Sequence, residues 1–321
     1  MNILSKILSI FLRRKKQGWA MENETEDDRD YKFAEAFGED IFGAVPGKLI
    51  KRTHKDMPRI PIQGMIVSCV TCACTFINSW YSKTEGNEVF LSWPFLYKQV
   101  YHFSSGTRIR DNLNALVNIG QCENNYLPER NFQWMGEWYA RRKSDLIPSM
   151  YLNASHYKTK GFFKVNQSSS IEMKAALRKA PLLIGVYTSG REWNAKGIIK
   201  KTNHSSSYGH VISIYAEHDE NTWEIVDWDG EIKLLDKEFP IASCFAILNL
   251  PDNYKANMTK IVKTPNGKMY ALLPNGSKQY ISTPAQLEEW VKQFQVKKIE
   301  EVKEEQIARM PDTENGMMFI K

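Results

Sequence analysis

The stretch Gln-Gly-Met-Ile-Val-Ser-Cys fills residues 63–69 and opens an apolar run, residues 70–80, that is typical of a helix. Gln63 stands six positions before Cys69, at the head of this run. A cysteine at a helix N-terminus faces unpaired backbone N–H groups and the positive end of the helix dipole, which favours the thiolate. A glutamine one short loop earlier can aim its side-chain N–H at a developing oxyanion. We therefore predict a nucleophile at Cys69 with Gln63 beside it.

Two downstream segments, residues 208–215 and 223–230, are rich in β-branched and aromatic residues and predict a pair of strands joined by a polar turn. His210 lies 141 positions after Cys69 (210 − 69), and Asp227 lies 17 positions after His210 (227 − 210). In an antiparallel pair, the start of one strand lies opposite the end of the next. We expect Asp227 to reach one imidazole nitrogen while the other faces the cysteine, as a covalent thiol mechanism requires.

Neighbouring residues offer alternatives to this pair. His204 is the other histidine in the region, but it lies in a polar loop, whereas an apolar strand follows His210. Asp229 becomes the orienting acid if the hairpin register shifts by two residues. Trp228 either packs over the histidine pair or belongs to the core. The remaining tryptophans of the domain are expected to be core anchors: Trp80, Trp93, Trp134, Trp138 and Trp193.

The chain resembles the papain family of cysteine peptidases, in the divergent form found in bacteria and their viruses. That family carries Gln-Gly-x-x-x-Ser-Cys at its nucleophile, which residues 63–69 match in register. Its histidine follows at a separation of roughly 130–150 residues, and His210 fits that range. Segments similar to further family blocks follow in the family's order, at residues 91–97, 106–128 and 171–187.

The resemblance spans residues 45–250 and implies an α+β class and a papain-like two-lobed fold. A helical lobe would surround Cys69, and a β-barrel-like lobe would carry His210 and Asp227, with the site in the cleft between them. The implied activity is hydrolysis of peptide bonds in a protein or peptide substrate. A Cys-His-Asp triad would perform it with Gln63 as oxyanion donor and with no metal or cofactor.

Departures from the family pattern keep two other functions open. Ile66 and Val67 replace the usual Cys-Gly, Val70 replaces a tryptophan, and Asp227 stands where asparagine is usual. One alternative is a catalytically weak or inactive papain-fold protein that serves as a structural or binding component of a larger assembly, for example in a phage. The other is an amidase or acyltransferase that acts on cell-wall peptide or an isopeptide bond with the same residues.

Composition narrows the class of protein. Of 321 residues, 42% are hydrophobic and 25% charged, which is ordinary for a globular protein, and the net charge of +6 comes with no nucleic-acid motif. Three of the five cysteines crowd the predicted helix, where disulfide geometry is poor. We therefore expect a reducing, intracellular or virion-associated location. A zinc site is the competing interpretation of Cys69 and Cys72. It is disfavoured because the sequence has no second cluster of cysteines or histidines at ligand spacing.

Residues 1–44 form a first segment with an amphipathic helical stripe over residues 3–12, a basic cluster at 13–16 and an acidic linker at 17–31. The helix is expected to dock on the domain or a partner chain, or alternatively to lie on a membrane surface. Its charge order differs from that of a secretory signal, and no apolar run is long enough to span a bilayer. Relatives in the papain family often carry an inhibitory prosegment at the position that residues 1–44 occupy here.

The peptidase-like domain is assigned to residues 45–251, and residues 252–321 predict a small separate module. Its pattern is a strand at 269–273, an Asn-Gly turn, a strand at 278–281 and a helix at 285–294, followed by a charged tail. Docking to a larger assembly is the role we expect for this module.

Overall fold

The structure is a computed structural model that describes residues 19, 32–37, 48–64, 66–101, 106–132, 140, 142–193, 197–202, 208–249, 260–272, 278–293 and 299–308. The chain divides into two compact units, residues 1–248 and 249–321. The roles predicted for its three segments remain predictions. Among the described helices, none is long and apolar enough to cross a bilayer.

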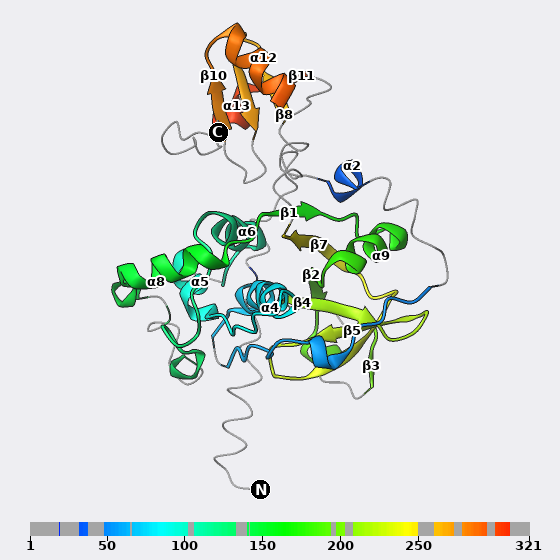
Figure 1. Ribbon diagram of the computed structural model, residues 1–321. Coiled ribbons are helices and arrows are strands. Elements are labelled where there is room, and N and C mark those ends of the chain that lie inside the picture. Colours follow the sequence, from blue (N-terminus) through cyan, green and yellow to red (C-terminus); the bar gives the residue numbers. More distant parts are fainter. Residues whose placement is uncertain are drawn as a thin grey trace, which may run out of the picture. The chain divides into compact units, whose positions relative to one another are not determined.

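The first lobe of the larger unit is built from helices around α4 (Cys69–Thr84), which is buried at every position from Cys69 to Trp80 (Figure 1). This confirms the predicted helix. α4 packs against neighbouring helices on one side and against strand β4 on the other. The other helices of this lobe are α5 (Trp93–Val100), α6 (Ile109–Asn118) and α8 (Pro148–Ala154), with 3₁₀ turns at His54–Asp56, Glu129–Asn131, Lys143–Asp145 and Ser155–Tyr157.

Serine caps explain where two helices begin. Ser92 Oγ accepts a hydrogen bond from the Phe95 backbone N–H at 3.2 Å, with proline in the first turn of α5. Ser169 Oγ accepts from the Glu172 N–H at 3.2 Å at the start of α9 (Ser170–Lys179). Ser68, before α4, makes no such cap, and its hydroxyl lies 3.6 Å from the Cys72 sulfur.

The second lobe is a seven-stranded sheet within the described residues, in the order β1-β7-β2-β4-β5-β6-β3 (Figure 1). Neighbouring strands are antiparallel except β3 and β6, which are parallel. Together with the helices, the sheet confirms the α+β class. Its strands are β1 (Gly161–Lys164), β2 (Leu182–Thr188), β3 (Ile198–Ile199), β4 (Tyr208–Glu217), β5 (Thr222–Val226), β6 (Ile232–Asp236) and β7 (Ile241–Leu248).

Strands β4 and β5 form the predicted hairpin. Ser213 pairs with Val226, and Glu217 pairs with Trp223, with an irregularity in the register between these pairs. The end of β5 therefore lies opposite the middle of β4. The other neighbour of β4 in the sheet is β2, and the short helix α10 (Gly190–Trp193) follows β2 in the chain.

The described residues before 48 pack against the sheet. Helix α2 (Phe33–Ala36) brings Phe33 and Phe37 onto Phe163, with ring centroids 6.5 and 5.2 Å apart. This short segment is thus docked on β1. The buried Trp19 ring packs directly against Gly185. A Cβ atom added at residue 185 would lie 2.6 Å from the ring, which is too close for a side chain. The N-terminal helix at 3–12 and the rest of the acidic linker lie outside the described residues.

The smaller unit has its own four-stranded sheet, in the order β10-β9-β8-β11. The two predicted strands are confirmed as an antiparallel pair, while the turn between them lies outside the described residues. The predicted charged tail instead contributes a strand, β11, parallel to β8, because Val302 next to it joins the apolar face of that sheet. The elements are β8 (Lys260–Lys263), β9 (Met269–Leu272), β10 (Lys278–Ile281), α12 (Pro284–Gln293), β11 (Ile299–Glu301) and α13 (Glu304–Ala308).

Candidate active site

The packing of α4 on β4 brings the predicted nucleophile and base to the boundary between the lobes. Cys69 is the first residue of α4, and His210 is the third residue of β4. The backbone N–H of Val211, the residue after His210, donates a hydrogen bond to the Cys69 sulfur. Two residues far apart in the sequence are thus neighbours in the fold, as their spacing predicts.

His210 and Asp227 form a buried pair. His210 Nε2 lies 2.9 Å from Asp227 Oδ1, and the side chains are 1% and 2% exposed. The register that places Asp227 behind the imidazole is therefore the one that the structure adopts. Asp229 is 36% exposed and pairs with Lys233 Nζ at 2.5 Å. The other imidazole nitrogen, His210 Nδ1, is buried and makes no hydrogen bond.

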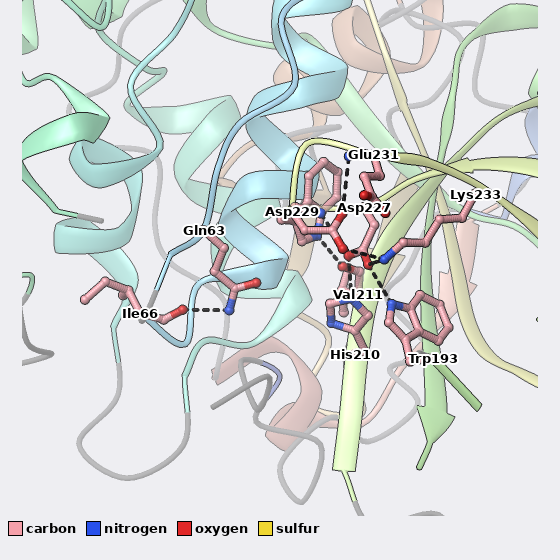
Figure 2. A network of polar contacts seen from close by, with 10 residues as sticks. Gln63, Ile66, Trp193, His210, Val211, Asp227, Asp229, Glu231 and Lys233 are labelled. Atoms are coloured by element: carbon pink, nitrogen blue, oxygen red, sulfur yellow. Dashed lines mark hydrogen bonds and ion pairs between the residues drawn. The ribbon is translucent and has the colours of Figure 1, made fainter. Parts of the chain in front are cut away.

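Further donors surround the Asp227 carboxylate, as Figure 2 shows. Oδ1 also accepts from the Trp228 backbone N–H at 2.8 Å. Oδ2 accepts from Trp193 Nε1 at 2.6 Å and from Lys233 Nζ at 2.5 Å. The Trp193 ring stands edge-on to the imidazole of His210, with centroids 5.0 Å apart and planes at 83°. The carboxylate is therefore fixed by groups from three separate elements.

Trp193 and Lys233 are members of this site that the sequence analysis missed. Trp193 was expected to be a core anchor, and it is buried, but its N–H points at Asp227. Lys233 follows Asp227 by six residues across a tight turn, and the pairing of Val226 with Ile232 brings both to one end of the hairpin. That spacing was the available signal for Lys233. The sequence carries no local signal for Trp193. Its helix α10 comes close to Asp227 only because β2, which precedes α10, pairs with β4 in the sheet.

Glu192 fixes the loop that carries Trp193. Its carboxylate accepts hydrogen bonds from the Ser189 N–H at 3.0 Å and from the Thr202 N–H at 2.9 Å, on either side of Trp193. Burial opposes ionisation of Glu192, but these backbone donors outweigh it and lower its pKa to about 2. Glu192 is thus charged at neutral pH and ties both ends of the loop together.

The expectation of an ionised thiol at Cys69 is wrong for this closed conformation. Cys69 is 0% exposed, and burial raises its pKa to about 12, although N–H groups of Val211, Val70 and Cys69 itself act in the opposite direction. Desolvation disfavours the charged form more than these donors and the helix dipole favour it. The thiol is therefore neutral, and Cys69 is closed off from solvent in this structure.

Gln63 lies in the loop that links the two lobes. Its backbone N–H donates to the Trp228 carbonyl at 3.0 Å, next to Asp227. Its side-chain Nε2 donates to the Ile66 carbonyl at 2.6 Å, within the turn at Gly64, where φ is +62° (Figure 2). One of the two amide hydrogens is therefore engaged in the loop. The oxyanion role of Gln63 remains a prediction.

The other candidates are placed as follows. Trp228 takes the core alternative, since its Nε1 donates to the Val211 carbonyl at 2.6 Å and its ring lies 6.1 Å from that of Phe76. His204 lies outside the described residues. All five cysteines are buried and none is in a disulfide. Among the described residues, no group of three histidine, cysteine or acidic side chains is arranged to hold a metal ion.

Comparison with solved structures identifies the fold. The chain is similar to xylellain, a cysteine protease from Xylella fastidiosa, with a TM-score of 0.60 and 21% identity over 74% of this chain and 98% of that one. It is similar to a recombinant stem bromelain precursor, with a TM-score of 0.54 and 13% identity over 74% and 78%. It also matches a Carica candamarcensis cysteine protease in complex with E-64, with a TM-score of 0.50 and 16% identity over 64% and 100%.

The chain therefore has the papain-like fold of these cysteine proteases. No protein-family model matches its sequence. No curated protein matches it either.

Proposed function

We propose that the chain is a cysteine peptidase. Cys69 is its nucleophile, His210 its general base and acid, and Asp227 the group that orients His210. The observation that carries this proposal is that His210 Nδ1 is buried and makes no hydrogen bond. The next residue, Val211, donates its backbone N–H to the Cys69 sulfur. Leaving a buried polar atom without a hydrogen bond costs about 1–3 kcal/mol, and a catalytic role is one physical reason for such an atom to persist.

The reaction follows from these positions. The Sγ–H proton of Cys69 passes to His210 Nδ1 as the sulfur attacks the peptide carbonyl. The Cys69 backbone N–H and the second side-chain N–H of Gln63 stabilise the oxyanion. The imidazolium then protonates the leaving amine as the C–N bond breaks. A water molecule, deprotonated by the imidazole, hydrolyses the thioester and regenerates the thiol.

Substrate binding has to open the closed site. Because the thiol is neutral and inaccessible, we infer that the peptide displaces whatever covers Cys69 before the proton moves. This distinguishes the chain from an enzyme with a preformed ion pair. Its thiol is expected to react slowly with a small alkylating reagent and faster with one that occupies the peptide site.

The closed site also favours a second candidate, an inactive papain-fold component of a larger assembly. Full burial of Cys69 and the use of the Gln63 amide within its own loop support this alternative. Docking through the termini to such an assembly, and a reducing location, remain proposals.

A single set of incubations separates these functions. The protein is incubated with a peptide library and with cell-wall fragments, in the presence and absence of EDTA. Peptide cleavage that is lost in Cys69→Ala and kept in Cys244→Ala supports the peptidase. Release from cell-wall fragments alone points to an amidase. Absence of any cleavage, together with labelling of Cys69 by a peptide-based alkylating reagent no faster than by iodoacetamide, contradicts both enzymes.

A further inference from the structure

The buried carboxylate of Asp227 is in direct contact with a cation. Lys233 Nζ lies 2.5 Å from Asp227 Oδ2, while His210 Nε2 lies 2.9 Å from Oδ1 of the same group. Lys233 projects from β6, and its side chain is 15% exposed. One carboxylate thus joins the imidazole on one oxygen and an ammonium on the other.

A carboxylate and an amide differ in how they affect an imidazole. Both accept a hydrogen bond from Nε2–H, but a carboxylate also stabilises the imidazolium through its charge. A bare aspartate behind the base would hold the proton that the base must give to the leaving amine. An ammonium within contact distance cancels most of that charge and leaves the hydrogen bond in place.

The charge state of Lys233 fits this role. Burial opposes its ionisation, but the Asp227 charge and the hydrogen bonds to both aspartates outweigh it and raise the pKa of Lys233. Lys233 is therefore positively charged over the whole range in which a histidine titrates. It also contacts Asp229 at 2.5 Å, but that side chain is 36% exposed, so water screens its charge.

Other titratable groups among the described residues lie close to this pair. Burial raises the pKa of three of them, so they are neutral at neutral pH: Cys69, Cys72 and Tyr208. Glu192 is ionised, but its charge is held by hydrogen bonds from Ser189 and Thr202.

From this geometry we infer that Lys233 is a positioning residue, which cancels the charge of Asp227 so that Asp227 orients His210 as a neutral amide would. The inference rests on the proposed function for its catalytic meaning. The electrostatic relation among the three side chains is nevertheless measurable without turnover. Lys233 contacts the carboxylates of Asp227 and Asp229, so it acts on the reaction through Asp227 and His210.

The test follows the imidazole resonance of His210 by NMR against pH, in a Cys69→Ala background where no catalysis occurs. The resonance is assigned by its loss in His210→Gln. In Lys233→Met, the midpoint of this titration is expected to move up by about one pH unit, because the ammonium no longer offsets the stabilisation of the imidazolium by the carboxylate. Lys233→Arg, which keeps the charge, is expected to restore the midpoint.

Two further variants make the test specific. Asp227→Asn is expected to move the midpoint down, because the imidazolium then faces the Lys233 ammonium without the carboxylate. Lys237→Met is the matched control, because Lys237 pairs with Glu217 rather than with Asp227. Should Lys233→Met not fold, as judged by its thermal transition, Lys233→Gln supplies a neutral side chain that retains a donor.

An unchanged midpoint in the folded Lys233 variant overturns the inference, whether or not the protein cleaves any peptide. A midpoint that does not fall in Asp227→Asn overturns it as well. Both shifts, in a protein that turns over no peptide, support the electrostatic role and count against the peptidase function alone. In an active protein, the optimum of kcat/KM moves to higher pH in the same variants, with KM little changed.

Discussion

Asp227 lies directly behind His210, with its Oδ1 2.9 Å from the imidazole Nε2 and both side chains almost completely buried. The contact leaves His210 Nδ1 as the nitrogen that faces away from the carboxylate, and Nδ1 makes no hydrogen bond. The orientation of the ring is thus set by Asp227, on a strand whose next residue contacts the Cys69 sulfur.

Removing the Asp227 carboxylate is expected to disable the base. Asp227→Ala frees the imidazole to rotate and to adopt the other tautomer, so we expect kcat/KM to fall by at least about a hundredfold. Steady-state kinetics on a cleavable peptide measure the loss. Asp219→Ala, in the turn of the same hairpin, is the control and should retain normal kinetics. Equal activity of the two variants would show that Asp227 does not orient the base.

Gln63 is expected to act in the transition state. Gln63→Ala should lower kcat by about 10²–10³-fold with a small change in KM, because an oxyanion donor binds the developing charge and not the ground state. The matched control is Gln99→Ala on α5, whose partner is Tyr151. A rise in KM with unchanged kcat would instead assign Gln63 to the support of its loop, through its bond to Ile66.

The buried thiol of Cys69 predicts a loss of stability at alkaline pH. Its pKa is about 12 in the folded chain against an ordinary 9.0, so above pH 9 the unfolded chain releases the proton first. The free energy of unfolding should then fall by up to about 1.4 kcal/mol per pH unit, and below pH 9 this contribution is constant. Urea denaturation should show a shallower alkaline decline in Cys69→Ala. Identical slopes would contradict full burial of the thiol.

Glu192 predicts a loss of stability in acid. Its pKa is lowered to about 2 by backbone donors that outweigh burial, so it stabilises the fold above its ordinary 4.5 and loses that contribution as the pH falls toward 2. Glu192→Gln should be less stable at neutral pH and less sensitive to acid over this range. Glu238→Gln, an exposed carboxylate, should follow the unaltered protein in the same denaturation series.

The smaller unit should unfold separately when its core is disrupted. Trp290 is 5% exposed and packs with Ile261, Ala271 and Ile281. Trp290→Ala should cost about 3–5 kcal/mol, which is most of the stability of so small a core. A calorimetric scan should then lose one transition and keep that of the larger unit. Tyr280→Ala, which is 49% exposed in the unaltered chain, should preserve both transitions.

Local pattern predicted the elements that carry the site. The helix from Cys69, the hairpin of β4 and β5 and the paired strands of the smaller unit all follow from side-chain periodicity and turn residues, which act over a few neighbours. The pairing of His210 with Asp227 followed too, because the length of a hairpin fixes its register. The strand β11 was missed, since three residues of a charged segment give no periodic signal.

The sequence by itself determined which side chains make up the candidate site and their order along the chain, because motif spacing and hairpin register can be read from the sequence. Only the tertiary structure decided their chemical state. Burial left the Cys69 thiol neutral where the helix terminus alone predicted a thiolate, and the sheet order brought Trp193 to Asp227. Desolvation and contacts between distant segments depend on the whole packed fold, so no short stretch of sequence contains them.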